Sequence, residues 1–132
     1  MAKLIHTMIR VRELEPSLKF YRDAFGLEVA YRLDFPEFSL AYLRNAETEA
    51  ELELTWNQDR NQPYRHGDGY GHVAFSVDDA DATRRRFSEL GLSPREMREF
   101  RDDNGGLIAR YFFVEDPDGY KIEVLERHGH YT

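Results

Sequence analysis

The sequence contains no cysteine among its 132 residues. This absence excludes disulfide bonds, zinc-thiolate sites and thiol nucleophiles. The sequence also lacks an apolar segment long enough to span a bilayer, and its N-terminus, MAKLIHTMIRV, lacks the apolar core and cleavage site of a signal peptide. We therefore expect a cytoplasmic protein without a membrane partner.

Basic residues are fewer than acidic ones. The chain has 18 Lys and Arg against 25 Asp and Glu, which gives a formal net charge of −7. Non-specific binding to nucleic acid or to an anionic membrane needs a basic surface, so neither partner is expected. Apolar residues make up 41% of the chain, which is enough for a core. The length fits one compact domain or two very small modules.

The chain contains a repeat. HTMIRVRELEPSLKFYRDAFGLEV begins at His6, and HVAFSVDDADATRRRFSELGLSP begins at His72. Each segment reaches Val five residues after its His, continues through a polar stretch and an amphipathic helix, and then reaches Gly-Leu. Such a repeat indicates that the two halves are structural equivalents.

Each half is predicted to form a strand, a helix and three further strands. The helices should end at Gly26 and Gly91, because glycine commonly terminates a helix. The later strands are predicted at about 28–35, 38–44 and 51–56 in the first half, and at about 94–100, 107–114 and 120–126 in the second. The fold class is therefore α+β, with two βαβββ modules in tandem within one domain, residues 1–132. The repeats cover about 4–57 and 71–127, and a polar linker covers about 58–70.

Strand alternation predicts which side chains lie away from the helices, since residues two apart share a face. The helix-facing set of the first strand is Ile5, Thr7, Ile9 and Val11. The same alternation in the other strands leaves a second set on the helix-free faces: His6, Arg10, Glu53, Thr55, Asn57, His72 and Glu123. Each half therefore contributes one His and one Glu to a helix-free face.

Two imidazoles and two carboxylates form a reasonable site for a divalent cation such as Ni, Co, Zn, Mn or Fe, and the donor types do not choose among them. Open coordination positions would hold water or substrate. Simpler explanations exist for each residue alone: a His at the start of a strand is often structural, and a Glu on an open face is often only solvated. Glu51 also has the same parity as Glu53. The recurrence of His and Glu in both repeats favours the metal site.

Several blocks resemble a known family. HTMIRV, SLKFYRDAFGLEV, ELELTWN, GYGHVAFSV and FVEDPDGYKIEVLE are similar to segments of glyoxalase I (lactoylglutathione lyase) of the short bacterial type, within the vicinal-oxygen-chelate (VOC) superfamily. The resemblance extends from His6 to Glu126. It implies paired βαβββ modules with half-open mixed sheets, and a homodimer with active sites at the interface that draw ligands from both chains.

The resemblance also implies a reaction and its residues. The family's metal ligands correspond to His6, Glu53, His72 and Glu123, with nickel favoured and zinc or cobalt as alternatives. The family isomerises the hemithioacetal of methylglyoxal and glutathione to S-lactoylglutathione, which detoxifies methylglyoxal through a metal-bound enediolate. Glu123 is the expected base for the proton transfer, and Glu53 is its partner for the opposite face or substrate enantiomer.

The thiol-binding residues match the family only in part. Arg10 and Asn57 correspond to positions that hold glutathione, and Arg10 suits a carboxylate, although a surface salt bridge would also explain it. Two basic positions of longer members are not reproduced: Asp68 occupies one, and the other falls near Ala109 and Arg110. Another low-molecular-weight thiol therefore stays open beside glutathione.

Other members of the superfamily provide the rival functions. Extradiol dioxygenases, or thiol transferases acting on fosfomycin, typically use two His and one carboxylate, so the presence of Glu53 argues against them. A non-catalytic ligand-binding protein, like the bleomycin-resistance relatives, would lack the metal ligands. Metal analysis and a methylglyoxal assay distinguish these alternatives.

Overall fold

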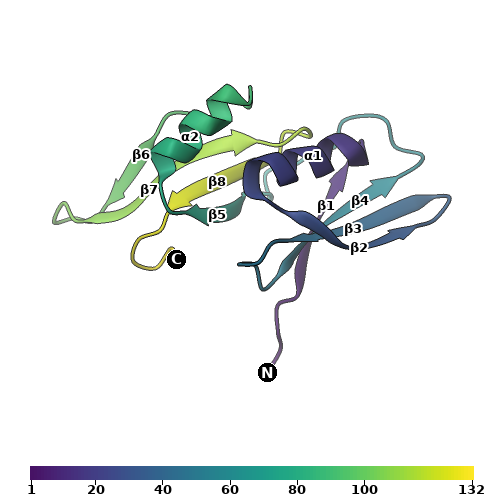
Figure 1. The fold of residues 1–132 in the computed structure, drawn as a ribbon, viewed down its shortest axis with the longest axis horizontal. Coiled ribbons are helices and arrows are strands. Elements are labelled where there is room, and N and C mark those ends of the chain that lie inside the picture. The colour runs from purple at the N-terminus through teal and green to yellow at the C-terminus, as the bar shows by residue number, and fades with distance from the viewer. The chain divides into compact units, whose positions relative to one another are not determined.

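The computed structural model describes all residues 1–132, and these form two units, Met1–Arg65 and His66–Thr132. The boundary between the units falls inside the predicted linker. Each unit consists of a strand, a helix and three further strands, in the predicted order (Figure 1). The predicted βαβββ repeat is therefore confirmed in both halves.

The first unit forms a four-stranded mixed sheet with strand order β1-β4-β3-β2. The first and last strands of the unit are parallel neighbours, and the other pairs are antiparallel. The predicted strands of this half are confirmed to within a residue. The elements are β1 (His6–Val11), α1 (Leu14–Phe25), β2 (Glu28–Asp34), β3 (Phe38–Arg44) and β4 (Glu51–Asn57).

The second unit repeats this topology in the order β5-β8-β7-β6. Its elements are β5 (Val73–Val77), α2 (Ala80–Glu89), β6 (Arg98–Arg101), β7 (Leu107–Glu115) and β8 (Lys121–Glu126). The prediction that β6 begins near Pro94 was wrong. Ser93 has a positive φ of 53° and Pro94 has no N–H to donate, so regular pairing starts only at Arg98.

Helix α1 follows the sequence signals closely. Pro16 lies in its first turn, and Gly26 ends the helix in the left-handed region with φ of 65° while its N–H donates to the Arg22 carbonyl. The helix covers Ile9 and Val11, which are buried. Ile5 and Thr7 were expected on the same face but are exposed. Burial on this face of β1 is therefore confined to the second half of the strand.

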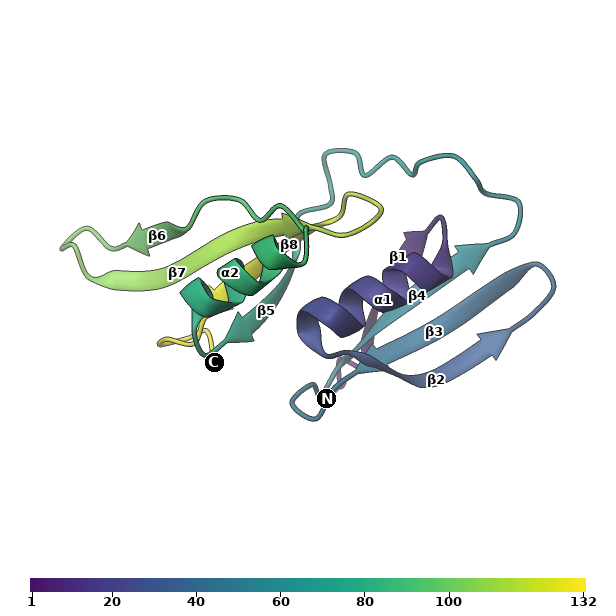
Figure 2. The same ribbon diagram turned by 45° about the horizontal axis from the view of Figure 1, so that its top comes forward.

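Figures 1 and 2 show that each helix crosses one face of the sheet in its own unit, and that no helix of the unit lies on the other face. The core of each unit lies between helix and sheet. Val11, Tyr21, Leu43 and Leu54 are almost inaccessible in the first unit, and Phe87, Phe112, Ile122 and Val124 in the second. Neither helix has the length and apolar character that crossing a membrane requires.

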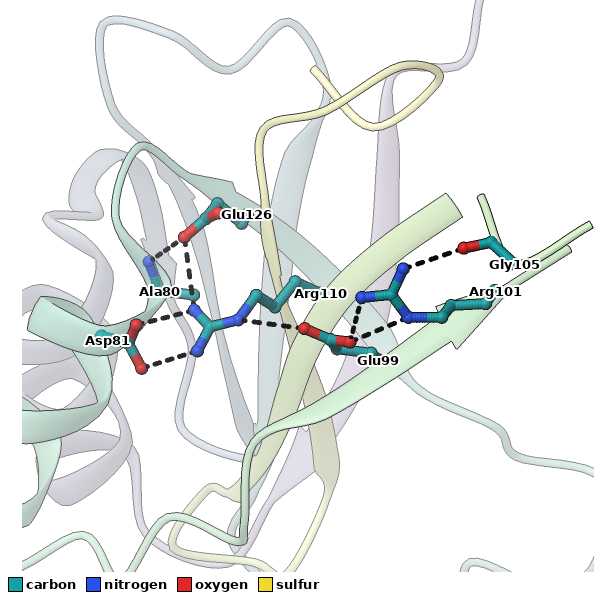
Figure 3. A network of polar contacts seen from close by, with 7 residues as sticks. All are labelled: Ala80, Asp81, Glu99, Arg101, Gly105, Arg110 and Glu126. Carbon is teal, nitrogen blue, oxygen red and sulfur yellow. Dashed lines mark hydrogen bonds and ion pairs between the residues drawn. The ribbon is translucent and has the colours of Figure 1, made fainter. Parts of the chain in front are cut away.

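A polar network fastens α2 to its sheet (Figure 3). The Arg110 guanidinium on β7 contacts both carboxylate oxygens of Asp81, at 2.8 and 2.9 Å. Glu126 of β8 accepts a hydrogen bond from the Ala80 N–H at 3.0 Å and lies 3.7 Å from Arg110. The hydrogen bond from Arg110 holds the pKa of Asp81 below its ordinary value. The first turn of α2 is therefore tied to two neighbouring strands.

Candidate functional site

The first unit brings His6 and Glu53 together on its helix-free face. The parallel pairing of β1 and β4 puts Met8 opposite Glu53, so His6, two residues earlier, lies on the same face. The distance between His6 Nε2 and Glu53 Oε1 is 3.3 Å. The Glu53 side chain is only 10% exposed, against 36% for His6. A buried carboxylate therefore faces a more accessible imidazole.

A threonine hydroxyl holds the Glu53 carboxylate in this position, and a tyrosine lies opposite it. Thr55 donates a hydrogen bond from Oγ1 to Glu53 Oε2 at 2.9 Å. Tyr42 lies directly opposite Glu53 in the pairing of β3 with β4. The interaction with the Glu53 carboxylate is the largest cause that raises the pKa of Tyr42 above its ordinary value. The Tyr42 ring also meets the His6 ring edge to face, with centroids 5.5 Å apart.

The second unit repeats the pair with His72 and Glu123. His72 Nε2 lies 3.6 Å from Glu123 Oε1, and the side chains are 42% and 17% exposed. Phe113 of β7 lies opposite Glu123, and its ring meets His72 edge to face at 5.5 Å. His72 itself lies just before β5 and not inside the strand as predicted, because regular pairing begins with Val73 opposite Ile122.

The two carboxylates differ in their surroundings. Phe113 has no hydroxyl at the position where the first unit has Tyr42. Leu125 stands two residues after Glu123, where the first unit has Thr55 two residues after Glu53. The only polar side chain that contacts Glu123 in the structure is His72. Glu53 therefore accepts a hydroxyl hydrogen bond, from Thr55, that Glu123 does not have.

Sequence reasoning placed Thr55 on the helix-free face but missed Tyr42. Alternation along SLAYLR puts Leu40 and Tyr42 on one face, and that signal was available. Alternation alone does not say which residue of a neighbouring strand lies opposite. The register of β3 against β4 supplies that information, and it brings Tyr42 to Glu53.

The donor set fits a divalent metal. Two donors at about 2.1 Å from one ion are separated by about 3.0 Å at a right angle and by about 3.4 Å at a tetrahedral angle. The His–Glu separations of 3.3 and 3.6 Å are close to these values. Neither unit gathers three or more His, Asp or Glu side chains into a metal-holding group. Each unit thus provides two donors of types that borderline divalent metals accept.

The predicted thiol-binding residues lie beside the first pair. Arg10 of β1 is exposed and stands opposite Thr55 in the register, on the face of Glu53. Asn57 follows Thr55 by two residues on β4 and therefore shares that face. Glu51 also shares the face, opposite His6 in the register, but the carboxylate in contact with the imidazole is that of Glu53.

Arg110 does not lie on the face of Glu123. Phe113 is opposite Glu123, and alternation along β7 therefore puts Ala109 on that face and Arg110 on the other. The guanidinium is bound to Asp81 of α2 (Figure 3). Neither Ala109 nor Arg110 therefore provides, on the face of Glu123, the basic side chain that longer family members have.

Comparisons with known proteins agree with this architecture. The model of the glyoxalase/bleomycin resistance protein/dioxygenase superfamily matches residues 3–124. The chain is 42% identical to the lactoylglutathione lyase of Haemophilus influenzae over 130 residues, which cover 94% of this chain and 92% of the relative. It is 40% identical to the probable lactoylglutathione lyase of a Synechocystis strain over 129 residues, which cover 93% of this chain and 94% of the relative.

A solved structure shows the same fold. The trypanothione-dependent glyoxalase I of Leishmania major superposes with a TM-score of 0.75 at 32% identity, covering 96% of this chain and 87% of the relative. The resemblance found in the sequence blocks is confirmed. The chain belongs to the glyoxalase/bleomycin resistance protein/dioxygenase superfamily and, within it, to the lactoylglutathione lyase (glyoxalase I) family.

Proposed function

We propose that this protein isomerises the hemithioacetal of methylglyoxal and glutathione to S-lactoylglutathione. The observation that carries the proposal is the duplicated His–Glu pair, which lies on the helix-free face of each unit. The names of relatives that cover nearly the whole chain support the same activity. The homodimer, the preference for nickel and the cytoplasmic location stay predictions.

His6, Glu53, His72 and Glu123 are the proposed ligands of one divalent metal. When bound, such a metal would act as a Lewis acid toward the substrate oxygens and stabilise negative charge on them. The separation of donors within each pair suits this role, since two cis ligands of one ion lie at similar distances. Nickel is favoured, and zinc or cobalt are the alternatives.

Glu123 is the proposed base. It would take the proton from the carbon that bears sulfur and return it to the neighbouring carbon. A base must move between these positions, and Glu123 has no hydroxyl contact that holds it, whereas Glu53 accepts a hydrogen bond from Thr55. Glu53 would then act chiefly as a ligand, or serve the opposite substrate enantiomer.

Arg10 and Asn57 are the proposed residues for the thiol part of the substrate. A guanidinium on the face of Glu53 suits the carboxylates of glutathione. Ala109 faces Glu123 and Arg110 is bound to Asp81, so neither provides a basic group for the carboxylates of glutathione beside Glu123. Turnover with other thiols must therefore be compared with turnover with glutathione.

The test is thioester formation by apo-protein reconstituted separately with nickel, cobalt and zinc. Methylglyoxal is supplied with glutathione and, in parallel, with trypanothione. The proposal expects metal-dependent formation of the lactoylthioester. Turnover of a catechol with oxygen instead would favour the dioxygenase alternative. Binding of less than about half a metal per chain, without turnover, would favour the non-catalytic alternative.

A further inference from the structure

The position of Arg10 recurs in the second unit with a different residue. Arg10 lies on β1, opposite the residue that follows Glu53 by two positions. At the equivalent position of β5 lies Ser76, opposite the residue that follows Glu123 by two positions. Pairing of this kind keeps both side chains on the face of the nearby carboxylate. The strand that carries a guanidinium in the first unit therefore carries only a hydroxyl in the second.

Asn57 has a charged counterpart in the second unit. It follows Glu53 by four positions, at the end of β4. Arg127 follows Glu123 by four positions, directly after β8. The second unit therefore also provides one guanidinium and one small polar side chain at this pair of positions, but the strands that carry them are exchanged.

The contacts of Arg127 put its guanidinium on the helix-free face. Its backbone N–H donates to the Val77 carbonyl at 2.8 Å, so the pairing with β5 continues for one residue beyond β8. Its Nε donates a hydrogen bond to Ser76 Oγ at 3.4 Å, and Ser76 shares the face of Glu123. The Arg127 side chain is 32% exposed, so a ligand on this face can reach it.

Arg127 also lies next to Ala109, where the basic side chain of longer family members is absent. Leu125 pairs with Tyr111 in the antiparallel ladder of β7 and β8. Two residues further along both strands, alternation puts Arg127 beside Ala109 on the same face. A basic group that β7 does not provide on this face is therefore provided by the segment that follows β8.

An exposed ion pair competes for the guanidinium. Arg127 Nη1 lies 2.8 Å from Asp78 Oδ1, and the Asp78 side chain is 86% exposed. Exposed ion pairs contribute little to stability, because water solvates both charges well when they separate. A ligand carboxylate can therefore replace Asp78 at little cost, and a guanidinium can bind such a carboxylate through two parallel hydrogen bonds.

We propose that Arg127 binds a carboxylate of the thiol part of the substrate on the face of Glu123. The proposed role of Arg10 on the face of Glu53 is the same, so each unit supplies one guanidinium. This inference rests on the proposed function and deepens it, because two guanidiniums select a thiol with two separated carboxylates. Glutathione belongs to this class, since it has one carboxylate in its γ-glutamyl residue and one in its glycyl residue.

The first test measures binding and needs no turnover. S-hexylglutathione, an unreactive thioether of glutathione, is titrated into the nickel-reconstituted protein by isothermal calorimetry. Arg127→Ala should weaken binding by at least about tenfold, as expected for the loss of a hydrogen bond between charged groups. Asp78→Asn keeps the guanidinium and removes its exposed partner, so the affinity should stay the same or rise. Equal weakening by the two substitutions would mean that the ion pair is structural and would overturn the proposed contact.

The second test separates a specific contact from a general effect of charge. Arg98→Ala is the matched control, because Arg98 is exposed and lies opposite Tyr111, on the face of Glu123. The substitution removes the same charge from the same face. It should change the affinity for S-hexylglutathione much less than Arg127→Ala does. Equal weakening by the two substitutions would assign the effect to net charge and overturn the contact.

The third test identifies the carboxylate with two analogues of S-hexylglutathione. One has its glycyl carboxylate blocked as an ethyl ester, and the other lacks the γ-glutamyl residue. Arg127→Ala should lose its effect with one analogue, because the carboxylate that it binds is then absent, and Arg10→Ala should lose its effect with the other. An effect of Arg127→Ala that is unchanged with both analogues would overturn the proposal.

The outcomes for the reaction and for the contact are distinguishable. If the wild-type protein forms no lactoylthioester, the proposed function fails, while binding of S-hexylglutathione still decides whether Arg127 binds its carboxylate. If the wild-type protein forms lactoylthioester and Arg127→Ala binds S-hexylglutathione as tightly as the wild type, the proposed function stands and the role of Arg127 is overturned.

Discussion

The pair of His6 with Glu53 and the pair of His72 with Glu123 are built by the same strand topology. The donor separations differ by only 0.3 Å, from 3.3 to 3.6 Å. Thr55 donates a hydrogen bond to Glu53 and Tyr42 lies opposite it, whereas the equivalent positions beside Glu123 are Leu125 and Phe113. The comparison teaches that duplication provides the matching donors, while the residues next to them give the two carboxylates different surroundings.

The largest effect is expected from removing the proposed base. Glu123→Gln should lower turnover by about 10²–10⁴-fold, because a positioned general base contributes that much. Glu53→Gln should lower turnover less when both variants are saturated with nickel. Steady-state kinetics on the two variants measure this difference. Equal losses of turnover in the two variants would contradict the proposal that Glu123 and Glu53 have different functions.

Loss of either histidine tests whether the pairs act together. His6→Ala and His72→Ala should each weaken nickel binding by more than about 100-fold, since even groups outside the ligand shell cost 10- to 100-fold. His66→Ala is the control, because that ring stacks on Tyr120 with centroids 4.2 Å apart and is not a proposed ligand. Nickel affinity is measured by chelator competition. If only one of the two substitutions weakened nickel binding, the two pairs would not contribute equally to the metal site.

Removal of the Thr55 hydroxyl tests whether its hydrogen bond makes the surroundings of Glu53 differ from those of Glu123. Thr55→Val keeps the shape and deletes a hydrogen bond to a buried carboxylate, so the free energy of unfolding should fall by roughly 1.5–3 kcal/mol. Thr7→Val, at an exposed position of β1, should stay within about 0.5 kcal/mol of the wild type. Urea unfolding measures both. Similar values for the two variants would mean that Thr55 does not hold Glu53.

Replacing Arg10 tests whether the first unit also binds the thiol part of the substrate. Arg10→Ala should raise KM for the glutathione hemithioacetal by about tenfold with kcat nearly unchanged, as expected for lost uniform binding. Arg85→Ala on the exposed surface of α2 is a charge-matched control. A fall in kcat with constant KM would instead connect Arg10 to the chemical step.

The smallest effect concerns the Arg110 network of the second unit. The pKa of Asp81 is lowered from 3.8, chiefly by the hydrogen bond from Arg110, so its contribution to stability is present above that value and is lost as pH falls below it. Wild type should therefore exceed Arg110→Met in urea stability at pH 7, and the gap should narrow by pH 3. The Asp81 side chain is exposed, so the difference should be modest. A gap independent of pH would assign the stabilisation to packing.

The sequence predicted much of the fold because its signals are local. Gly26 marked the end of α1, and Phe38 and Arg44 were correctly predicted as the ends of β3. The exposure of Ile5, just before β1, was not predicted, because alternation indicates the face of a residue and not whether another element covers it. The late start of β6 depends on the backbone at Ser93, whose positive φ has no clear sequence signal.

The candidate site was predictable to the level of residue pairs. Strand parity selected His6 with Glu53, and His72 with Glu123, and the structure brings each pair into contact. Parity did not reveal that Tyr42 lies opposite Glu53. That placement depends on the register between two strands, and the two residues are 11 positions apart in sequence. The unequal surroundings of the carboxylates therefore required the structure.

The most direct test of the central claim is a crystal structure of the nickel-reconstituted protein with anomalous scattering from the metal. The account predicts one ion bound by His6, Glu53, His72 and Glu123, with bonds of about 2.0–2.2 Å. An ion held by one His–Glu pair alone, or separate ions on the two pairs, would contradict it.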